Sequence, residues 1–314
     1  MSAKETTAHD AAHDAAANAR PDGAAILLVP EPTGNFRLAL ATFADSKSAI
    51  AGLVIVVALL LFCFVGPLFY HTDQIHTNLF AVHEVPGTPS HPLGTDEIGY
   101  DELGRLMAGG QTSLEVGIAA GLMATIIGTL WGAVSGYIGG IADTVMMRIV
   151  DALLSIPALF LLLVVAAIWT PSVPSLVVLI GLIAWLVPAR LVRGEALTLR
   201  VREYVQSVRM MGGGHSWAVL RHVLPNTVGT VVVNASFQVA DAIIYLAYLS
   251  FLGLGLPPPA TDWGGMLTNG IQYTFDGYWW LIYPPGVAIV LIVMAFNFIG
   301  DGLRDAFDAR LRRR

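Results

Sequence analysis

The stretch AIAGLVIVVALLLFCFVGPLFY, Ala49–Tyr70, runs for twenty-two residues without a charged side chain. A helix rises about 1.5 Å per residue, so this stretch is long enough to cross the roughly 30 Å of hydrocarbon in a bilayer. Backbone polar groups find no water inside lipid, which leaves the helix as the form open to a single segment. The stretch therefore predicts a transmembrane helix.

Five further apolar runs are long enough to do the same. The composition agrees, because 55% of the residues are hydrophobic and 13% are charged, about half the charged fraction of a soluble domain. We therefore expect an all-α polytopic membrane protein with six transmembrane helices. After the first, the spans are expected at Ser113–Tyr137, Val145–Trp169, Val173–Val192, Thr227–Leu249 and Leu281–Ile299.

The basic residues predict how the spans are oriented. Sixteen of the 17 Lys and Arg residues lie in the N-terminal tail, the Asp143–Asp151 turn, the loop 190–226 and the C-terminal tail. The two large loops on the opposite side, an outer loop at 71–112 and a second at 250–280, hold only Arg105. The positive-inside rule then places both termini in the cytoplasm.

The segment before the first span is amphipathic. Phe36, Leu40 and Phe43 recur there at helical spacing, which predicts a helix lying along the membrane surface. The Ala-, His- and Asp-rich start of the chain is predicted to be disordered. The predicted parts are a cytoplasmic tail at 1–34, an interfacial helix at 35–48, a six-helix domain at 49–300 and a second cytoplasmic tail at 301–314.

Several sequence features exclude classes of chemistry. Both lysines, Lys4 and Lys47, precede the first span, so the chain has no phosphate loop of the G-x-x-x-x-G-K-[ST] type. All eight histidines lie outside the predicted spans, which argues against a membrane-embedded Ser-His hydrolase. The histidines of the outer loop are too irregularly spaced for a metal-ligand pattern. We therefore expect no enzyme, no cofactor or metal bound by this chain, and, with a net charge of -6, no nucleic acid partner.

The polar stretch REYVQSVRMMGGGHSWAVLRHVLPN, Arg202–Asn226, separates two apolar runs. Its first part, Glu203–Met211, predicts a short helix, with Tyr204, Val208 and Met211 on one apolar face. Glycine readily adopts the left-handed conformation that ends a helix, so the triple glycine predicts a break. A second helix is expected to follow and to lead into the fifth span. A helix–break–helix of this kind fits a groove on a partner protein, whereas a solvated loop needs no second apolar face.

Most of this stretch, Gln206–Pro225, resembles the EAA loop of bacterial ABC-importer permeases. In that loop a glycine is followed by nine residues and then by one further matched position. A spacer residue and a Leu-Pro pair complete the pattern. The sequence departs from the family pattern where Gln-Ser-Val replaces Glu-Ala-Ala and where a histidine replaces a common isoleucine. The matching positions here are Gly212, His222, Leu224 and Pro225.

Longer blocks resemble the dipeptide/oligopeptide/nickel permease family, C-type subunit, and the likeness covers roughly Phe36–Arg310. The resemblance implies a permease of the type I ABC-importer kind in a bacterial inner membrane. It also implies a homologous second permease, two cytoplasmic P-loop ATPases that bind ATP and Mg²⁺, and an extracytoplasmic solute-binding protein. Short peptides are the expected substrate, and nickel or a nickel chelate is the alternative. The blocks are His91–Gly117, Gly136–Pro157, Leu249–Leu267 and Phe296–Arg310.

The resemblance further implies that the cytoplasmic coupling loop, 190–226, contacts an ATPase through its part 202–226, which we term the docking stretch. ATP-driven movement of the ATPases would then switch the pore between its two open states. The residues expected to make this contact are Glu203, Tyr204, Gln206, Ser207, Val208, Arg209, Gly212, Gly213, Leu224 and Pro225.

Asp241 lies about midway along the fifth span, where a carboxylate is costly and usually faces a cavity or a partner. Asn234 and Gln238 are expected on nearly the same face, so the three residues are candidates for the translocation path. A locally paired structural carboxylate is the alternative for Asp241. An ion-coupled transporter acting alone would show several such charges and an internal repeat; the sequence offers one mid-span carboxylate and no detectable repeat.

Other residues carry simpler expectations. Asp96 and Asp101 in the outer loop are candidates for contact with the binding protein, with a solvated acidic loop as the alternative. Arg148 and Asp151 are expected to form an i,i+3 surface pair. The glycines at four-residue spacing in the second span predict close packing against another helix; they are Gly128, Gly132 and Gly136.

Overall fold

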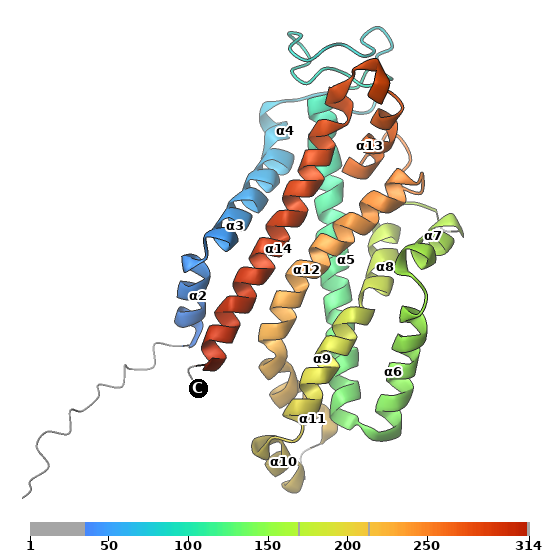
Figure 1. Cartoon of the computed structure of the whole chain (residues 1–314). Coiled ribbons are helices and arrows are strands. Elements are labelled where there is room, and N and C mark those ends of the chain that lie inside the picture. Colours follow the sequence, from blue (N-terminus) through green and yellow to red (C-terminus); the bar gives the residue numbers. More distant parts are fainter. Residues whose placement is uncertain (1–34, 169, 213, 313–314) are drawn as a thin grey trace, which may run out of the picture. The chain divides into compact units, whose positions relative to one another are not determined.

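The computed structural model describes residues 35–168, 170–212 and 214–312. Every regular element in these ranges is a helix, and no strand occurs in them (Figure 1). The chain separates into two units, residues 1–38 and 39–314, and most of the first lies outside the described residues, as does the tail predicted at 1–34. Helix α2 covers Asn35–Asp45, so the predicted amphipathic segment is helical; its place at a membrane surface stays a prediction.

Four continuous helical segments are long and apolar enough to cross a membrane, and two bent helix pairs bring the number to six within the described residues. The polytopic all-α fold is thereby confirmed. The first continuous segment, Lys47–Phe69, consists of α3 (Lys47–Leu60), a π-helical turn (Leu61–Val65) and α4 (Gly66–Phe69), and the second is α5 (Glu102–Ile138). The third, His215–Phe251, consists of α11 (His215–Ala218), a π-helical turn (Val219–Val223) and α12 (Leu224–Phe251). The fourth is Trp279–Asp308, and most of it belongs to α14 (Tyr283–Arg312).

The third span is broken. Sequence periodicity predicts one helix over Val145–Trp169, but the structure has α6 (Gly140–Leu154) and α7 (Ala158–Ile168) at 81° to each other. Pro157 separates the two helices. Its ring removes a backbone donor and disfavours the helical conformation of the residue before it, which accounts for the break.

The fourth span bends by 43° between α8 (Val173–Ala184) and α9 (Leu186–Leu199). Pro188 has no N–H to donate to the carbonyl of Ala184, four residues earlier. That carbonyl accepts a hydrogen bond of 3.0 Å from the Nε2 of Gln238, a buried residue of α12. A side chain from the fifth span thus replaces the backbone bond that proline removes.

Helix α5 lies at the centre of the unit and packs against α8, α9 and α12. The predicted close packing of its glycines is confirmed. An added Cβ at Gly136 would meet the carbonyl oxygen of Arg193 in α9 at 2.7 Å, and one at Gly128 would meet that of Trp185 at the same distance. No Cβ fits at such distances, so α9 approaches α5 only because these positions are glycine.

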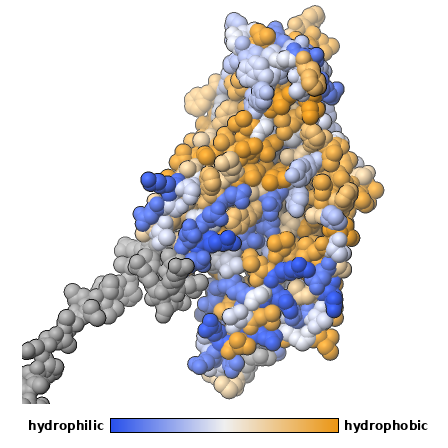
Figure 2. Space-filling view, viewed as in Figure 1, coloured by the Kyte–Doolittle hydropathy of each residue, from blue (hydrophilic) through white to orange (hydrophobic). Residues whose placement is uncertain are grey.

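Hydrophobic and hydrophilic side chains are unevenly distributed over the surface. Hydrophobic side chains cover most of the middle of the face seen in Figure 2, and hydrophilic ones gather over its lower part, where the ends of α9 and α12 and the short helix α10 (Glu203–Met210) lie. Many large apolar side chains of the spans are exposed, among them Val54, Ile126, Phe160 and Val290. Such a belt is expected of a protein whose solvent is lipid.

Candidate functional site

The docking stretch has the predicted helix–break–helix form. Helix α10 ends at Met210, and α11 begins at His215 and runs through the π-helical turn into α12 without interruption. Gly212 between them has φ 81°, in the left-handed region, which disfavours a side chain by roughly 1–2 kcal/mol. The position is open in space, because nothing lies within 4 Å of a Cβ added there.

The buried face of α10 differs from the predicted one. Val205 is fully buried and Val208 is 6% exposed, and both pack in a cluster with Val219, Val223 and the end of α5. Tyr204 and Met211, which the sequence placed on the apolar face with Val208, are exposed. The prediction failed because α11 and α5, which are not visible in the local pattern, decide which side of the short helix is covered.

The outward side of the docking stretch carries exposed large apolar side chains that sequence reasoning missed. Met210 and Met211 are 82% and 79% exposed, and Trp217 and Leu220 are 52% and 62% exposed. Large apolar side chains exposed on a polar loop are typical of an interaction site, and methionine adapts to irregular partners.

The other predicted residues of the docking stretch have modest local roles. The Gln206 side chain donates to the carbonyl of Val201, and the Ser207 hydroxyl donates to that of Glu203. Pro225 is exposed near the start of α12, and Leu224 beside it is half-buried. Gly213 and the side chain of Arg209 lie outside the described residues.

A buried polar network holds α9, which leads to the docking stretch, against α5 and α6. Arg193 makes two bonds to the Asp143 carboxylate, of 2.6 and 2.7 Å, and the Ser135 hydroxyl donates to the same carboxylate at 2.5 Å. Asp151, predicted to pair with Arg148, pairs instead with Arg190 of α9 at 2.5 Å. The i,i+3 spacing was a weaker determinant than the packing of α9 on α6.

A groove of about 1,360 Å³ opens beside the docking stretch, and we term it the inner groove. Its walls come from α9, α10, α12 and α14, and the described residues that line it include three carboxylates and two guanidinium groups. Those charged residues are Glu195, Glu203, Asp308, Arg202 and Arg304.

The structure sets Gln238 apart from the other two residues predicted for the translocation path. Gln238 is 3% exposed and bonded to Ala184, so it serves the bend of the fourth span. Asn234 borders the inner groove. Asp241 is exposed on α12, and no described residue forms a hydrogen bond or ion pair with it.

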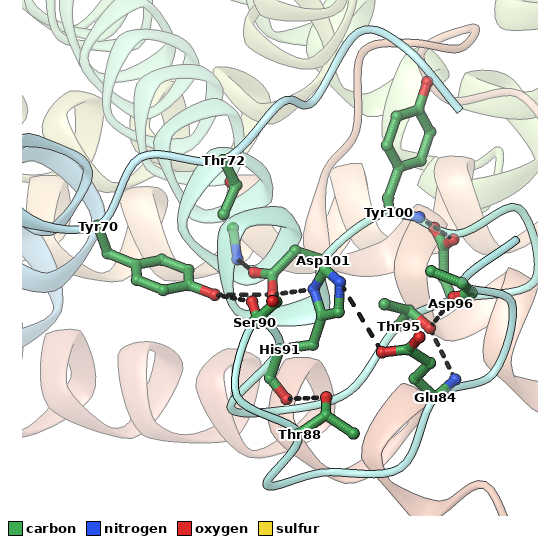
Figure 3. Close-up of polar contacts among 12 residues, drawn as sticks. Tyr70, Thr72, Glu84, Thr88, Ser90, His91, Thr95, Asp96, Tyr100 and Asp101 are labelled. Carbon is green, nitrogen blue, oxygen red and sulfur yellow. Dashed lines mark hydrogen bonds and ion pairs between the residues drawn. The ribbon is translucent and has the colours of Figure 1, made fainter. Parts of the chain in front are cut away.

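The two outer-loop aspartates are buried and occupied by the loop itself, as Figure 3 shows. Asp101 caps α5 by accepting a bond of 2.7 Å from the Gly104 N–H, and it also accepts from the Tyr70 hydroxyl at 2.9 Å. The Nδ1 of His91 lies 3.0 Å from the same carboxylate. An N-cap aspartate and its partners fix where the long helix begins.

Asp96 accepts from the N–H groups of Ile98 and Tyr100, and its carboxylate lies 3.8 Å from Arg105. Burial raises the pKa of Asp96, against the lowering effect of these donors. Arg105 in turn donates to the carbonyl of Pro259 in the other outer segment at 2.8 Å. Both aspartates therefore shape the outer loop, and any part they take in receiving a binding protein is through that shape.

Comparison with known proteins adds the family. Residues 128–313 match the family described as the binding-protein-dependent transport system inner membrane component, and residues 34–85 match the N-terminal transmembrane domain of oligopeptide transport permease C.

Individual relatives match along most of their length. A protein of Brucella suis that carries a peptide permease name is 42% identical over 284 residues, 90% of this chain and 93% of the relative. The oligopeptide transport system permease protein OppC of Escherichia coli K12 is 40% identical over 271 residues, 86% and 89% of the two chains. The OppC protein of Bacillus subtilis is 34% identical over 275 residues, 88% and 90%.

Proposed function

Because the chain belongs to the family of inner membrane components of binding-protein-dependent transport systems, we propose that it is the permease subunit of an ATP-driven importer of short peptides. Members of this family are multi-pass transport components of the inner membrane and not enzymes. Peptides are favoured over nickel as the cargo because the relatives carry peptide and oligopeptide permease names.

The observation that carries the coupling role is the docking stretch. It projects two short helices joined at a left-handed glycine, and its outward side bears exposed methionine, tryptophan and leucine. An amphipathic helix pair of this shape fits an apolar groove on another protein. The partner that the family supplies for this side is a pair of cytoplasmic ATPases, which would bind the ATP and Mg²⁺.

The remaining partners follow from the same assignment. Half of the translocation path would come from this chain and half from a homologous second permease, and a solute-binding protein would deliver the peptide to the outer loops. Asp241 is exposed at mid-span, and a carboxylate there is too costly to leave against lipid. We assign its side of α12 to the translocation path.

The test is uptake of labelled di-, tri- and longer peptides by the native host, with and without this chain, alongside uptake of nickel-63. Peptide uptake should be lost with the chain and restored by the wild type. Nickel loss alone would overturn the peptide assignment and leave the transport role standing.

The coupling role is tested by Gly212→Asp, which should leave the protein in the membrane and abolish uptake. Gly214→Asp is the matched control, because Gly214 has φ -67° and equally open surroundings. Full uptake by the Gly212 variant would refute the coupling role.

A further inference from the structure

A narrow stripe of polar residues follows one face of α12 from mid-span to the inner groove. Thr230, Asn234 and Asp241 are separated by four and seven residues, so they fall within about 40° of one another around the helix axis. Phe237 lies on the same face and borders the groove with Thr230 and Asn234. Asp241 thus lies on the same face of α12 as the residues that border the groove, seven positions beyond Asn234.

Helix α9 adds a carboxylate to the groove end of this stripe. Glu195 borders the groove together with Thr230 and Asn234. The apolar pattern of the sequence had assigned Glu195 to a loop, whereas the structure continues the helix to Leu199.

Two acceptor oxygens at this point lack donors. The Oε2 of Glu195 and the Oδ1 of Asn234 are buried, and no described residue donates a hydrogen bond to either. Buried polar atoms are almost always paired, so two unpaired acceptors on two helices that line the same groove call for a donor from outside the chain. The terminal carboxylate torsion of glutamate is soft, so its oxygen can turn toward the groove without backbone movement.

The chemistry selects the ligand. A carboxylate and an amide carbonyl are acceptors, and the preferred occupant is a positively charged donor such as an ammonium group. Among the described residues that line the groove, carboxylates outnumber guanidinium groups by one. One of the guanidinium groups that line it, that of Arg304, lies over the ring of Phe237, with its Cζ 5.8 Å from the ring centroid.

We propose that Glu195, Thr230 and Asn234 form a site for a lysine side-chain ammonium group of the transported peptide where the translocation path meets the inner groove. The proposal rests on the proposed function for the identity of the cargo. An ammonium group leaving Asp241 would find its next acceptors along the same face of α12.

The first experiment measures the charge preference of the site directly in the assembled, reconstituted transporter. Asn234→Cys is introduced after the single native cysteine, the buried Cys63, is replaced by alanine. Its reaction rate is compared for two methanethiosulfonate reagents of similar size, one with an ammonium and one with a sulfonate group. We expect the cationic reagent to react about tenfold faster, as one nearby negative charge would give.

Glu195→Gln keeps the size of the side chain and removes the charge, so the tenfold preference should vanish. Asp308→Asn is the matched control, since it removes a carboxylate from the exposed rim of the same groove; the preference should persist. Equal rates for both reagents, a preference that survives Glu195→Gln, or protection from both reagents by the second permease would overturn the site.

Transport gives a second readout. Glu195→Gln should slow uptake of a lysine-containing tripeptide several-fold more than uptake of the same peptide with methionine in place of lysine, about the effect of one lost bond to a charged group. Equal slowing of both peptides would overturn a role in recognising the cation. Absence of peptide uptake in the wild type, with the labelling preference intact, would refute the proposed function and leave the cation site standing.

Discussion

Replacing Gln238 by leucine should expose how the fourth span tolerates its proline. The substitution keeps the size of a side chain that is 3% exposed and removes the Nε2 donor, 3.0 Å from the Ala184 carbonyl. Pro188 offers no N–H in its place, so the carbonyl is left buried and unpaired. The full desolvation penalty then applies, and we expect the free energy of unfolding to fall by about 1–3 kcal/mol.

The double variant isolates the cause. In a Pro188→Ala background the alanine N–H can bond the Ala184 carbonyl, so Gln238→Leu should cost less than about half its value in the wild type. Unfolding of the purified protein in a graded denaturing detergent measures all four variants under one condition. The same cost in both backgrounds would refute the account, because it would show that the side chain acts through packing and not through the carbonyl.

Three further predictions follow from the structure. Gly212→Ala should lower uptake while Gly214→Ala leaves it unchanged, because only Gly212 has a positive φ; equal effects measured by peptide uptake would contradict this. Val205→Ser should loosen α10 from the cluster beneath it by roughly 1.5–3 kcal/mol, seen as faster proteolysis at the docking stretch, whereas the exposed Met210→Ser should not. Burial raises the pKa of Asp262 above its ordinary 3.8, so its contribution to stability falls as pH rises from 3.8 through the raised value; Asp262→Asn should reduce the fall in melting temperature over that range, and an unchanged slope would count against it.

The fold was largely predictable because each span is visible in the sequence as a long apolar run. The helices extend beyond these runs, as α5 does from Glu102 where the pattern begins at Ser113. Bends were harder to predict. The prolines are visible in the sequence, but Gln238, which donates the hydrogen bond to the Ala184 carbonyl, lies 54 residues away.

The sites were predictable in form and less so in detail. Gly212 marked the break in the docking stretch, because the left-handed conformation is a local property of glycine. The buried face of α10 depends on packing against α5 and α11, which no local pattern contains. Asp101 carried a usable signal, since an aspartate directly before a helix is a typical N-cap; we considered for it only a partner contact or a solvated acidic loop.

The groove walls show how the docking stretch can act at a distance. Only Arg200–Arg202 separate α9 from α10, and α11 continues into α12 without a break. A displacement of the docking stretch therefore moves both helices that carry the proposed cation site, Glu195 on one and Asn234 on the other. Arg193 ties α9 to the carboxylate of Asp143, which belongs to α6. This ion pair restrains the α9 wall of the groove. Among the described residues, α12 forms no comparable ion pair. The two walls should then shift by different amounts, which would open or close the groove between them and change the affinity of the site for its ligand.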